Sequence, residues 1–234
     1  MRIKESHAKY LAGLLDADGW FGFQWKTETK AYPKLCLKQK SETVLNWIRK
    51  NIGLGWFTED SWCVSSKRDL NALLPHILKH MVIKAKLWEW VYTTDAPSKA
   101  EWTLRRRTDV GPLRSKKHPT WAWVAGYLDG DGWISHTKRN DTIGYTTRVG
   151  VLSHHSDRIA VDLLYKAFGG GICVKKDGVQ WQHGLGKGNR DFAINFLSKL
   201  VPHLVRKRHN AEMILHYHRS QRLSEDTSTE ETIV

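Results

Sequence analysis

An internal repeat constrains the fold of this chain of 234 residues more than any other feature. Residues 11–20 read LAGLLDADGW and residues 124–133 read VAGYLDGDGW, so seven positions carry the same residue in register 113 positions later. Three weaker matches follow in the same order, namely 37–42 with 152–157, 52–55 with 168–171, and 74–76 with 201–203. Matches that keep their order along the chain predict a duplicated structural unit.

The repeat divides the chain into four parts. We predict an N-terminal half over residues 1–95, a basic linker over 96–118, a C-terminal half over 119–223, and a disordered acidic tail over 224–234. The linker contains proline and glycine as breakers together with several Lys and Arg residues, so it is either a solvated tether or a segment that contacts phosphates. The tail is rich in Ser, Thr and Glu, a composition typical of disorder.

The net charge points to an anionic partner. The chain carries 37 Lys and Arg against 24 Asp and Glu, a formal charge of +13. Such a charge attracts nucleic acid, although solubility or an anionic membrane surface would explain it as well. No apolar run reaches the roughly 18 residues of a membrane span, and no apolar signal core follows the first residues. We therefore expect an intracellular protein without membrane contact, with Cys36, Cys63 and Cys173 as three separate thiols of a reducing compartment.

Each half is predicted to fold in the order αββαββαα, which makes the chain an α+β protein with two pseudo-symmetric halves. In the first half we expect helices near residues 6–17, 41–53, 68–80 and 82–93, and strands near 20–28, 32–39, 55–59 and 61–65. Ser41 is expected to cap the second helix, which should end near Gly53. The second half repeats this order, with Ser156 as the cap.

Both motif segments are apolar and end in the sequence Asp-x-Asp-Gly, with Gly19 and Gly132 expected as left-handed helix stops. A carboxylate is unfavourable at the negative end of a helix, so a nearby cation is expected to offset the cost. Small residues recur at spacing four in each helix, and this lets the two helices approach closely. Asp18 and Asp131 would then meet near a pseudo-two-fold axis and form a hard oxygen site for Mg²⁺, suited to phosphodiester hydrolysis.

The motif has three other interpretations. A single Asp-x-Asp-Gly is usually a turn or a cap, but two copies that each close an apolar helix argue against that interpretation. An EF-hand loop begins in the same way, yet Thr27 stands where its bidentate glutamate is required. A dinucleotide fingerprint needs Gly-x-Gly-x-x-Gly after a strand, which neither segment offers.

The two segments closely resemble the signature of the LAGLIDADG homing endonucleases, and the first departs from the family name only at Leu15. The resemblance covers nearly the whole chain apart from the linker and tail, and the two copies are similar to the single-chain members. It implies two halves that form a β-saddle over DNA, with the motif helices packed at the centre. It also implies a monomer that cuts both strands of a long asymmetric target with Mg²⁺, for which other divalent metals can substitute, leaving 3′-hydroxyl and 5′-phosphate ends with short 3′ overhangs.

The resemblance also assigns site residues. Asp18 and Asp131 would bind the metals together with the carbonyl groups of Ala17 and Gly130, while Asp16 and Asp129 would brace the helix ends. A polar residue after the second strand would order water near the metal, which corresponds to Gln39 and, in the second half, to His154, or to His155 after a shift of one residue. A lysine after the third helix would approach the scissile phosphate. The candidates are Lys84 and Lys207.

In the family, strand residues on the open face of the saddle contact the DNA. Period-two alternation in the second strand turns Leu35 and Leu37 towards the helices and their neighbours towards the DNA. The DNA-binding candidates are Gln24, Lys26, Glu28, Lys34, Lys38, Thr137, Arg139, Asp141, Arg148 and Lys176.

Two rival functions share the same fold. The first is an RNA-binding maturase that helps its own intron to splice, so intron RNA would be a further partner. The second is a DNA-binding regulator without catalysis, which the two intact motif acids disfavour. No residues of intein splicing are evident, so the resemblance favours an intron-encoded enzyme.

Overall fold

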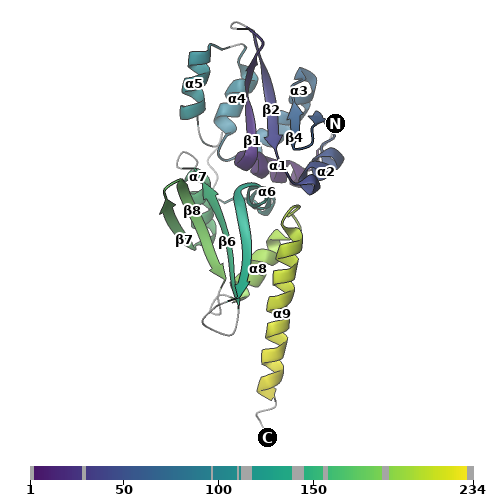
Figure 1. The fold of residues 1–234 in the computed structure, drawn as a ribbon, viewed down its shortest axis with the longest axis vertical. Helices are drawn as coiled ribbons and strands as arrows, with labels where there is room; N and C mark the ends of the chain where they lie inside the picture. The colour runs from purple at the N-terminus through teal and green to yellow at the C-terminus, as the bar shows by residue number, and fades with distance from the viewer. Residues whose placement is uncertain are drawn as a thin grey trace.

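The computed structural model describes residues 3–27, 30–95, 97–109, 111, 118–138, 145–154, 158–185 and 190–230. The N-terminal half consists of α1 (Glu5–Asp18), β1 (Gly19–Trp25), β2 (Ala31–Lys38), α2 (Glu42–Asn51), β3 (Trp56–Phe57), β4 (Ser61–Val64), α3 (Lys67–Ile77), the short 3₁₀ helix η1 (Leu78–His80) and α4 (Ala85–Thr93). The C-terminal half consists of α6 (Trp121–Asp131), β5 (Gly132–Lys138), β6 (Tyr145–Ser153), α7 (Arg158–Phe168), β7 (Gly171–Lys175), β8 (Gly178–Leu185), α8 (Arg190–Leu200) and α9 (Arg208–Glu230). The predicted order αββαββαα is confirmed in both halves. Figure 1 shows how the two halves are arranged.

Each half contains one antiparallel sheet of four strands, in the orders β1-β2-β4-β3 and β5-β6-β8-β7. The predicted alternation in β2 is confirmed, because Leu35 and Leu37 are fully buried while Lys38 is exposed. Helices pack against the buried face of each sheet, with α4 against β1 and α7 against β6 and β8. The alternate strand residues form an opposite face that none of these helices covers.

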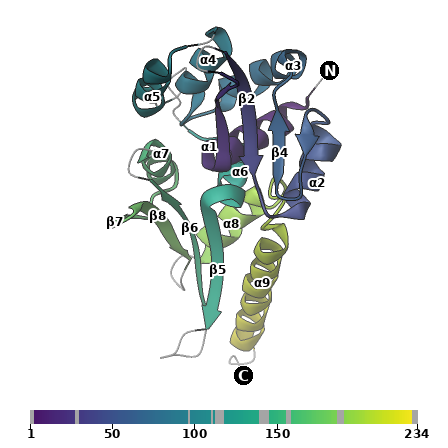
Figure 2. The same ribbon diagram turned by 45° about the horizontal axis from the view of Figure 1, so that its top comes forward.

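The two motif helices α1 and α6 lie side by side at the junction of the halves (Figure 2). Glycines set how closely they approach. A Cβ atom on Gly13 would overlap the carbonyl group of Trp123, and one on Gly126 would overlap the carbonyl group of Tyr10. The prediction that small residues let the backbones meet is therefore confirmed. Residues 10–16 of α1 and 122–129 of α6 are buried without interruption, so this contact forms the centre of the core.

The expectation of left-handed helix stops at Gly19 and Gly132 is wrong. Gly19 has φ −76° and Gly132 has φ −93°, and each continues directly into a strand. Both positions exclude a side chain for a different reason, because a Cβ atom would collide with Leu15 or Leu128 one turn earlier. Gly53 does end its helix in the left-handed region, with φ +67°.

The capping prediction is only half right. Ser41 precedes α2 in an extended conformation, but its side chain makes no capping hydrogen bond. Ser156 lies outside the described residues.

The segment expected to be a linker contains an additional helix, α5 (Lys99–Thr108), capped by the Ser98 side chain. Its Trp102 stacks on Trp90 of α4 and meets the edge of Phe23 in β1. This aromatic cluster ties the segment to the N-terminal half. At the other end, α9 continues to Glu230 instead of leaving a disordered tail after residue 223. Ala211, Ile214 and Leu215 bury the start of that helix, and helix propagation from a packed start is favourable.

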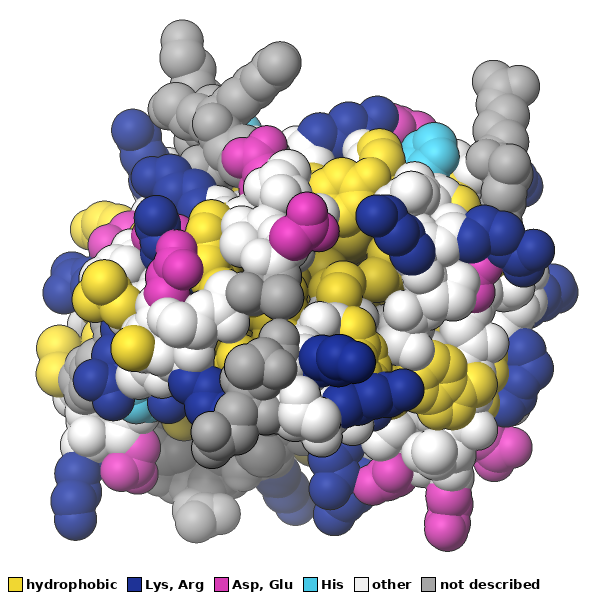
Figure 3. Space-filling model, turned by 90° about the horizontal axis from the view of Figure 1, so that it is seen from above, with side chains coloured by type: hydrophobic (Ala, Val, Ile, Leu, Met, Phe, Trp, Pro, Cys, Tyr) yellow, Lys and Arg dark blue, Asp and Glu magenta, His cyan; other side chains and the backbone are white. Residues whose placement is uncertain are grey.

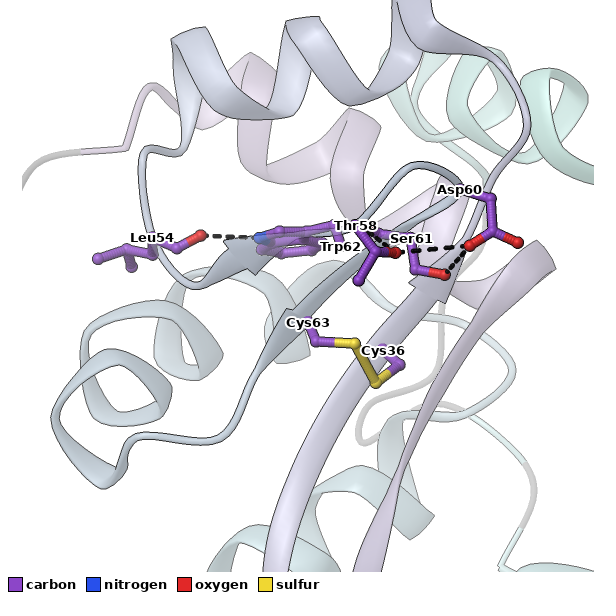
Figure 4. Close-up of a disulfide and its surroundings, with 7 residues drawn as sticks. All are labelled: Cys36, Leu54, Thr58, Asp60, Ser61, Trp62 and Cys63. Atoms are coloured by element: carbon purple, nitrogen blue, oxygen red, sulfur yellow. Dashed lines mark hydrogen bonds between the residues drawn. A yellow bond between two sulfur atoms is a disulfide. The ribbon is translucent and has the colours of Figure 1, made fainter.

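The cysteines also differ from expectation, because Cys36 and Cys63 form a disulfide and Cys173 is the free cysteine among the described residues (Figure 4). The two half-cystines face each other directly across the β2–β4 pair. Two strand positions 27 residues apart in sequence become neighbours only through the sheet pairing, which sequence spacing does not reveal. Among the described residues, no helix combines the length and apolar character that crossing a bilayer requires.

Candidate active site

The first acid of each motif binds the loop that follows the third helix of its own half. The carboxylate of Asp16 accepts hydrogen bonds from three consecutive backbone N–H groups, those of Val82 at 2.6 Å, Ile83 at 3.1 Å and Lys84 at 3.0 Å. Asp16 is almost fully buried, and burial raises its pKa while these hydrogen bonds act to lower it. The carboxylate therefore fixes the backbone from which the Lys84 side chain extends.

Asp129 repeats this arrangement in the C-terminal half. Its carboxylate accepts from the backbone N–H groups of Val205 at 2.7 Å, Arg206 at 3.0 Å and Lys207 at 2.9 Å. Each carboxylate also receives a hydrogen bond from the other motif helix. Tyr10 donates its hydroxyl to Asp129 at 2.9 Å, and Trp123 donates its indole N–H to Asp16 at 3.0 Å.

The two lysines place their ammonium groups at the C-terminal ends of the motif helices. Lys84 Nζ donates to the carbonyl oxygens of Leu15 at 3.1 Å, Ala17 at 2.9 Å and Gly19 at 2.9 Å. Lys207 Nζ donates to the carbonyl oxygens of Leu128 at 2.5 Å and Asp129 at 3.0 Å. A cation is favoured at this end of a helix. The protein's own lysines thus supply part of the positive charge that the sequence suggested a bound metal would provide.

The second acids, Asp18 and Asp131, end the two helices beside these lysines. The Asp18 carboxylate lies against the other motif helix, since a Cβ atom on Gly130 would be 3.2 Å from its Oδ2 atom. Asp18 is half-buried whereas Asp131 is exposed. Burial raises the pKa of Asp18, and the charges of Lys84, Arg206 and Lys207 act to lower it.

Lys207 interacts electrostatically with both Asp18 and Asp131. Burial lowers its pKa to about 8, while Asp129, Asp18 and Asp131 act to raise it and Arg206 lowers it further. Its ammonium group bonds carbonyl oxygens at the end of α6 and interacts electrostatically with the second acid of both motifs. Asp18, Asp131 and Lys207 therefore form one electrostatic cluster.

Gln39 touches this cluster. It is buried, and its amide nitrogen donates to Asp18 Oδ2 at 3.3 Å while its amide oxygen accepts from the backbone N–H of Ser41 at 3.2 Å. Fixing the oxygen in this way turns the amide donor towards the carboxylate.

The expected counterpart of Gln39 is wrong in register. Gly19 pairs with Leu37 in the first sheet and Gly132 pairs with Val151 in the second, so Gln39 corresponds to Ser153 and not to His154. Ser153 is buried and shares a hydrogen bond of 2.6 Å with the Tyr127 hydroxyl. His154 is exposed one residue further on, and His155 lies outside the described residues.

The open sheet faces carry most of the described DNA-binding candidates. Gln24 of β1, Thr137 of β5 and Arg148 of β6 are exposed, as are Lys26 and Lys38 beside β1 and at the end of β2. Lys34 and Arg148 occupy equivalent register positions, opposite Gly22 and Ser135. Lys176 is exposed in the turn between β7 and β8. Glu28, Arg139 and Asp141 lie outside the described residues.

Basic side chains are spread widely over the molecule. Figure 3 views it from the top of Figure 1, where Lys and Arg lie around exposed hydrophobic side chains. Such a distribution matches the net charge of +13 and suits a polyanionic ligand.

A metal at this site would need ligands beyond carboxylates. Within the described ranges, no group of three His, Cys, Asp or Glu side chains could hold a metal ion. Two carboxylates with backbone oxygens and water are the set that Mg²⁺ accepts in phosphoryl-transfer sites, where substrate phosphates complete the shell. Asp18, Asp131 and the Gly130 carbonyl fit that set. The Ala17 carbonyl already accepts from Lys84, which leaves it a second lone pair.

Sequence reasoning missed Tyr10, Trp123 and Arg206. Arg206 donates from its guanidinium to the carbonyl oxygen of Asp129 at 3.2 Å. Tyr10 and Trp123 occupy the same position of the repeat, immediately before the first motif residue of each copy. Two aromatic residues that both carry a polar donor within apolar helices were the available signal.

No model of a protein family and no curated protein matches this sequence. Solved structures match its fold. The LAGLIDADG meganuclease I-AabMI bound to uncleaved DNA aligns with TM-score 0.68 at 14% identity over 92% of each chain. The LAGLIDADG homing endonuclease I-GzeII in complex with its DNA target aligns with TM-score 0.68 at 15% identity, over 94% of this chain and 91% of that one.

A third structure gives the same result. The I-SmaMI LAGLIDADG homing endonuclease bound to cleaved DNA aligns with TM-score 0.65 at 14% identity, over 93% of this chain and 90% of that one. I-SmaMI was also solved on an uncleaved DNA target in the presence of calcium ions. The predicted fold is therefore confirmed. The chain has the LAGLIDADG homing endonuclease fold with both of its halves in one polypeptide.

Proposed function

We propose that this chain is a site-specific endonuclease that hydrolyses both strands of duplex DNA with a divalent metal. The expected metal is Mg²⁺, for which other divalent metals can substitute. One observation carries the proposal. Two carboxylates, Asp18 and Asp131, end adjoining helices at the centre of a two-fold arrangement, and Lys84 and Lys207 hold positive charge beside them. The nucleases of the same fold that were solved on DNA support this assignment.

The chain's own residues divide the chemistry among them. Asp18, Asp131 and the carbonyl oxygens of Ala17 and Gly130 would hold the metal, which when bound supplies Lewis acidity to the scissile phosphates. Lys84 and Lys207 stabilise the negative charge that develops on the phosphate oxygens in the transition state. Gln39 orients the Asp18 carboxylate through its amide donor.

The two sheets would lie along the DNA major groove. Gln24, Lys26, Lys34, Lys38, Thr137, Arg148 and Lys176 are the proposed contacts among the described residues, with Glu28, Arg139 and Asp141 as further candidates. Because the two open faces present different side chains, the target is asymmetric. We propose that a monomer acts on a long site and leaves 3′-hydroxyl and 5′-phosphate ends with short 3′ overhangs, as an intron-encoded homing enzyme would.

The test is cleavage of a randomised duplex library in Mg²⁺ by the wild type and by Asp18→Asn and Asp131→Asn. Each substitution keeps the side-chain size but removes the charge that a metal requires. Asp162→Asn, in an exposed ion pair of α7, is the matched control. We expect one long cut site from the wild type and the control, and no double-strand product from either motif variant.

Three results would contradict the proposal. Tight duplex binding without cutting would identify a DNA-binding regulator, and binding of intron RNA without DNA cleavage would identify a maturase. Double-strand cleavage that survives both motif substitutions would show that the chemistry lies elsewhere.

A further inference from the structure

Tyr10 and Trp123 form a pair of hydrogen bonds that cross between the halves in opposite directions. The Tyr10 hydroxyl of α1 reaches Asp129 in α6, and the Trp123 indole of α6 reaches Asp16 in α1. The acceptors are buried as well as the donors, with Asp129 0% and Asp16 2% exposed, so water does not compete for either carboxylate. The two donors stand at equivalent positions of the repeat, which makes the crossing symmetric.

The acceptors are the two carboxylates that hold the lysine loops. Oδ2 of Asp129 receives Tyr10 as well as the N–H groups of Val205 and Arg206, and Oδ1 receives the N–H of Lys207. Removing the Tyr10 hydroxyl takes away one of four donors and lets the carboxylate rotate about its remaining bonds. The backbone N–H of Lys207 still bonds Oδ1, but the carboxylate that holds it is less firmly fixed, and so is the ammonium group at the end of α6.

Asp16 accepts the equivalent set of hydrogen bonds in the N-terminal half. Oδ2 of Asp16 receives Trp123 and the N–H of Val82, and Oδ1 receives the N–H groups of Ile83 and Lys84. Lys84 belongs to the N-terminal half, whereas its outermost support, Trp123, belongs to the C-terminal half.

We propose that Tyr10 and Trp123 are positioning residues that act across the pseudo-two-fold axis, so that each half holds in place the lysine at the end of the other half's motif helix. Tyr10 acts on Lys207 through Asp129, and Trp123 acts on Lys84 through Asp16. This inference rests on the proposed nuclease function for its effect on cleavage, but the geometric coupling does not depend on that function. The consequence is that cutting of one strand depends on a residue of the half that carries the other lysine.

The first test measures the nicking rate of each strand of the target separately. Lys207→Ala and Lys84→Ala identify the strand that depends on each lysine. We expect Tyr10→Phe to slow the Lys207-dependent strand by about tenfold, as the loss of one hydrogen bond to a charged group predicts, and to leave the other strand nearly unchanged. Trp123→Phe should show the opposite strand preference.

Matched variants separate positioning from general stability. Tyr127→Phe removes a different buried hydroxyl, the one of α6 that bonds Ser153. It should slow both strands alike or neither. Trp123→Tyr and Trp123→Phe differ only in a hydroxyl donor, and Trp123→Tyr should recover part of the rate of the Lys84-dependent strand. Equal slowing of both strands by Tyr10→Phe, or an effect no different from that of Tyr127→Phe, overturns the proposal.

A second readout requires no DNA. The acetylation rates of Lys84 and Lys207 by an amine-reactive ester are followed by peptide mass spectrometry. Tyr10→Phe should raise the rate at Lys207 by about threefold or more, because one hydrogen bond that restrains its loop is gone, with no change at Lys84. Trp123→Phe should do the reverse. If the variants leave the labelling rates unchanged, or change both lysines alike, the coupling is overturned. If each variant changes only the expected lysine while the wild type cuts no DNA, the coupling is upheld and the nuclease function is rejected.

Discussion

A single methyl group at Gly13 would test whether the close approach of α1 and α6 sets both the stability and the activity of this protein. In Gly13→Ala the new Cβ atom would overlap the carbonyl oxygen of Trp123 and lie 2.9 Å from the backbone nitrogen of Tyr127, where 3.4 Å is ordinary contact. Both atoms belong to the backbone of α6, so no side chain can rotate away. The helices must separate or bend to admit the methyl group.

Two opposing terms determine the magnitude. Replacing glycine by alanine inside a helix is by itself stabilising by about 0.5–1 kcal/mol. Overpacking of a well-packed core costs about 1–3 kcal/mol, and backbone against backbone lies at the upper end. We therefore expect the free energy of unfolding to fall by about 2 kcal/mol. Gly126→Ala should cost as much, and the double variant should cost less than the sum, because helices already separated by one methyl group admit the second more easily.

The assay is urea unfolding of the two single variants and the double variant. Gly184→Ala is the control, because nothing lies within 4 Å of a Cβ atom there. DNA cleavage should fall further than folding, by about a hundredfold, since a shift of about 1 Å in catalytic geometry has that effect. A Gly13→Ala variant more stable than the wild type would refute the reasoning, as it would mean that the helices do not touch at this point.

Three further predictions concern single features. The pKa of Lys207 in the folded protein is about 8, below its usual 10.5, so between these values the unfolded chain binds one more proton than the folded protein does. The free energy of unfolding of the wild type, relative to that of Lys207→Met, should therefore rise between pH 8 and 10. A difference that does not change with pH in urea unfolding would contradict the burial of that ammonium group. Reduction of the Cys36–Cys63 disulfide, which spans 27 residues, should lower the free energy of unfolding by about 3 kcal/mol. Cys173→Ser should respond to reductant as the wild type does. Gln39 bonds Asp18, whereas its counterpart Ser153 bonds Tyr127. The two strands of the target should therefore be nicked at unequal rates, which time courses on supercoiled plasmid measure. Equal rates would mean that the contact between Gln39 and Asp18 does not affect cleavage.

The sequence was sufficient to predict the order of the elements and the central helix pair. Periodicity predicted the helices and strands to within a few residues, since most elements have one buried face. The spacing of Gly13, Ala17, Gly126 and Gly130 predicted the contact between α1 and α6. These features are local or repeated, so they can be recognised in a single chain.

Features that depend on pairing between distant residues were not predictable. The disulfide and the correspondence of Gln39 with Ser153 both follow from strand register. Aligning similar residues of the two copies gave His154 as the counterpart of Gln39. The β5–β6 hairpin is one residue longer than the β1–β2 hairpin, and the sequence does not show where the extra residue lies. The role of Gly19 was misjudged for a related reason. Glycine is required there by contact with Leu15, whereas only a turn was considered.

The residues that are alike in the two halves are those that support each other across the contact between α1 and α6. Gly13 and Gly126 approach the backbone of the opposite half, so an unmatched change in one would disturb a contact made by the other. Asp16 and Asp129 each accept a hydrogen bond from the opposite half. Lys84 and Lys207 bond the helix end of their own half and depend on the other half only through these aspartates. The sheet faces have no such partner. Cys36 and Cys63 correspond by register to Gly150 and Gln182, and they would face a DNA ligand rather than another part of the chain. A duplicated nuclease can therefore keep a symmetric centre for cutting two strands while each open face adapts to a different half-site.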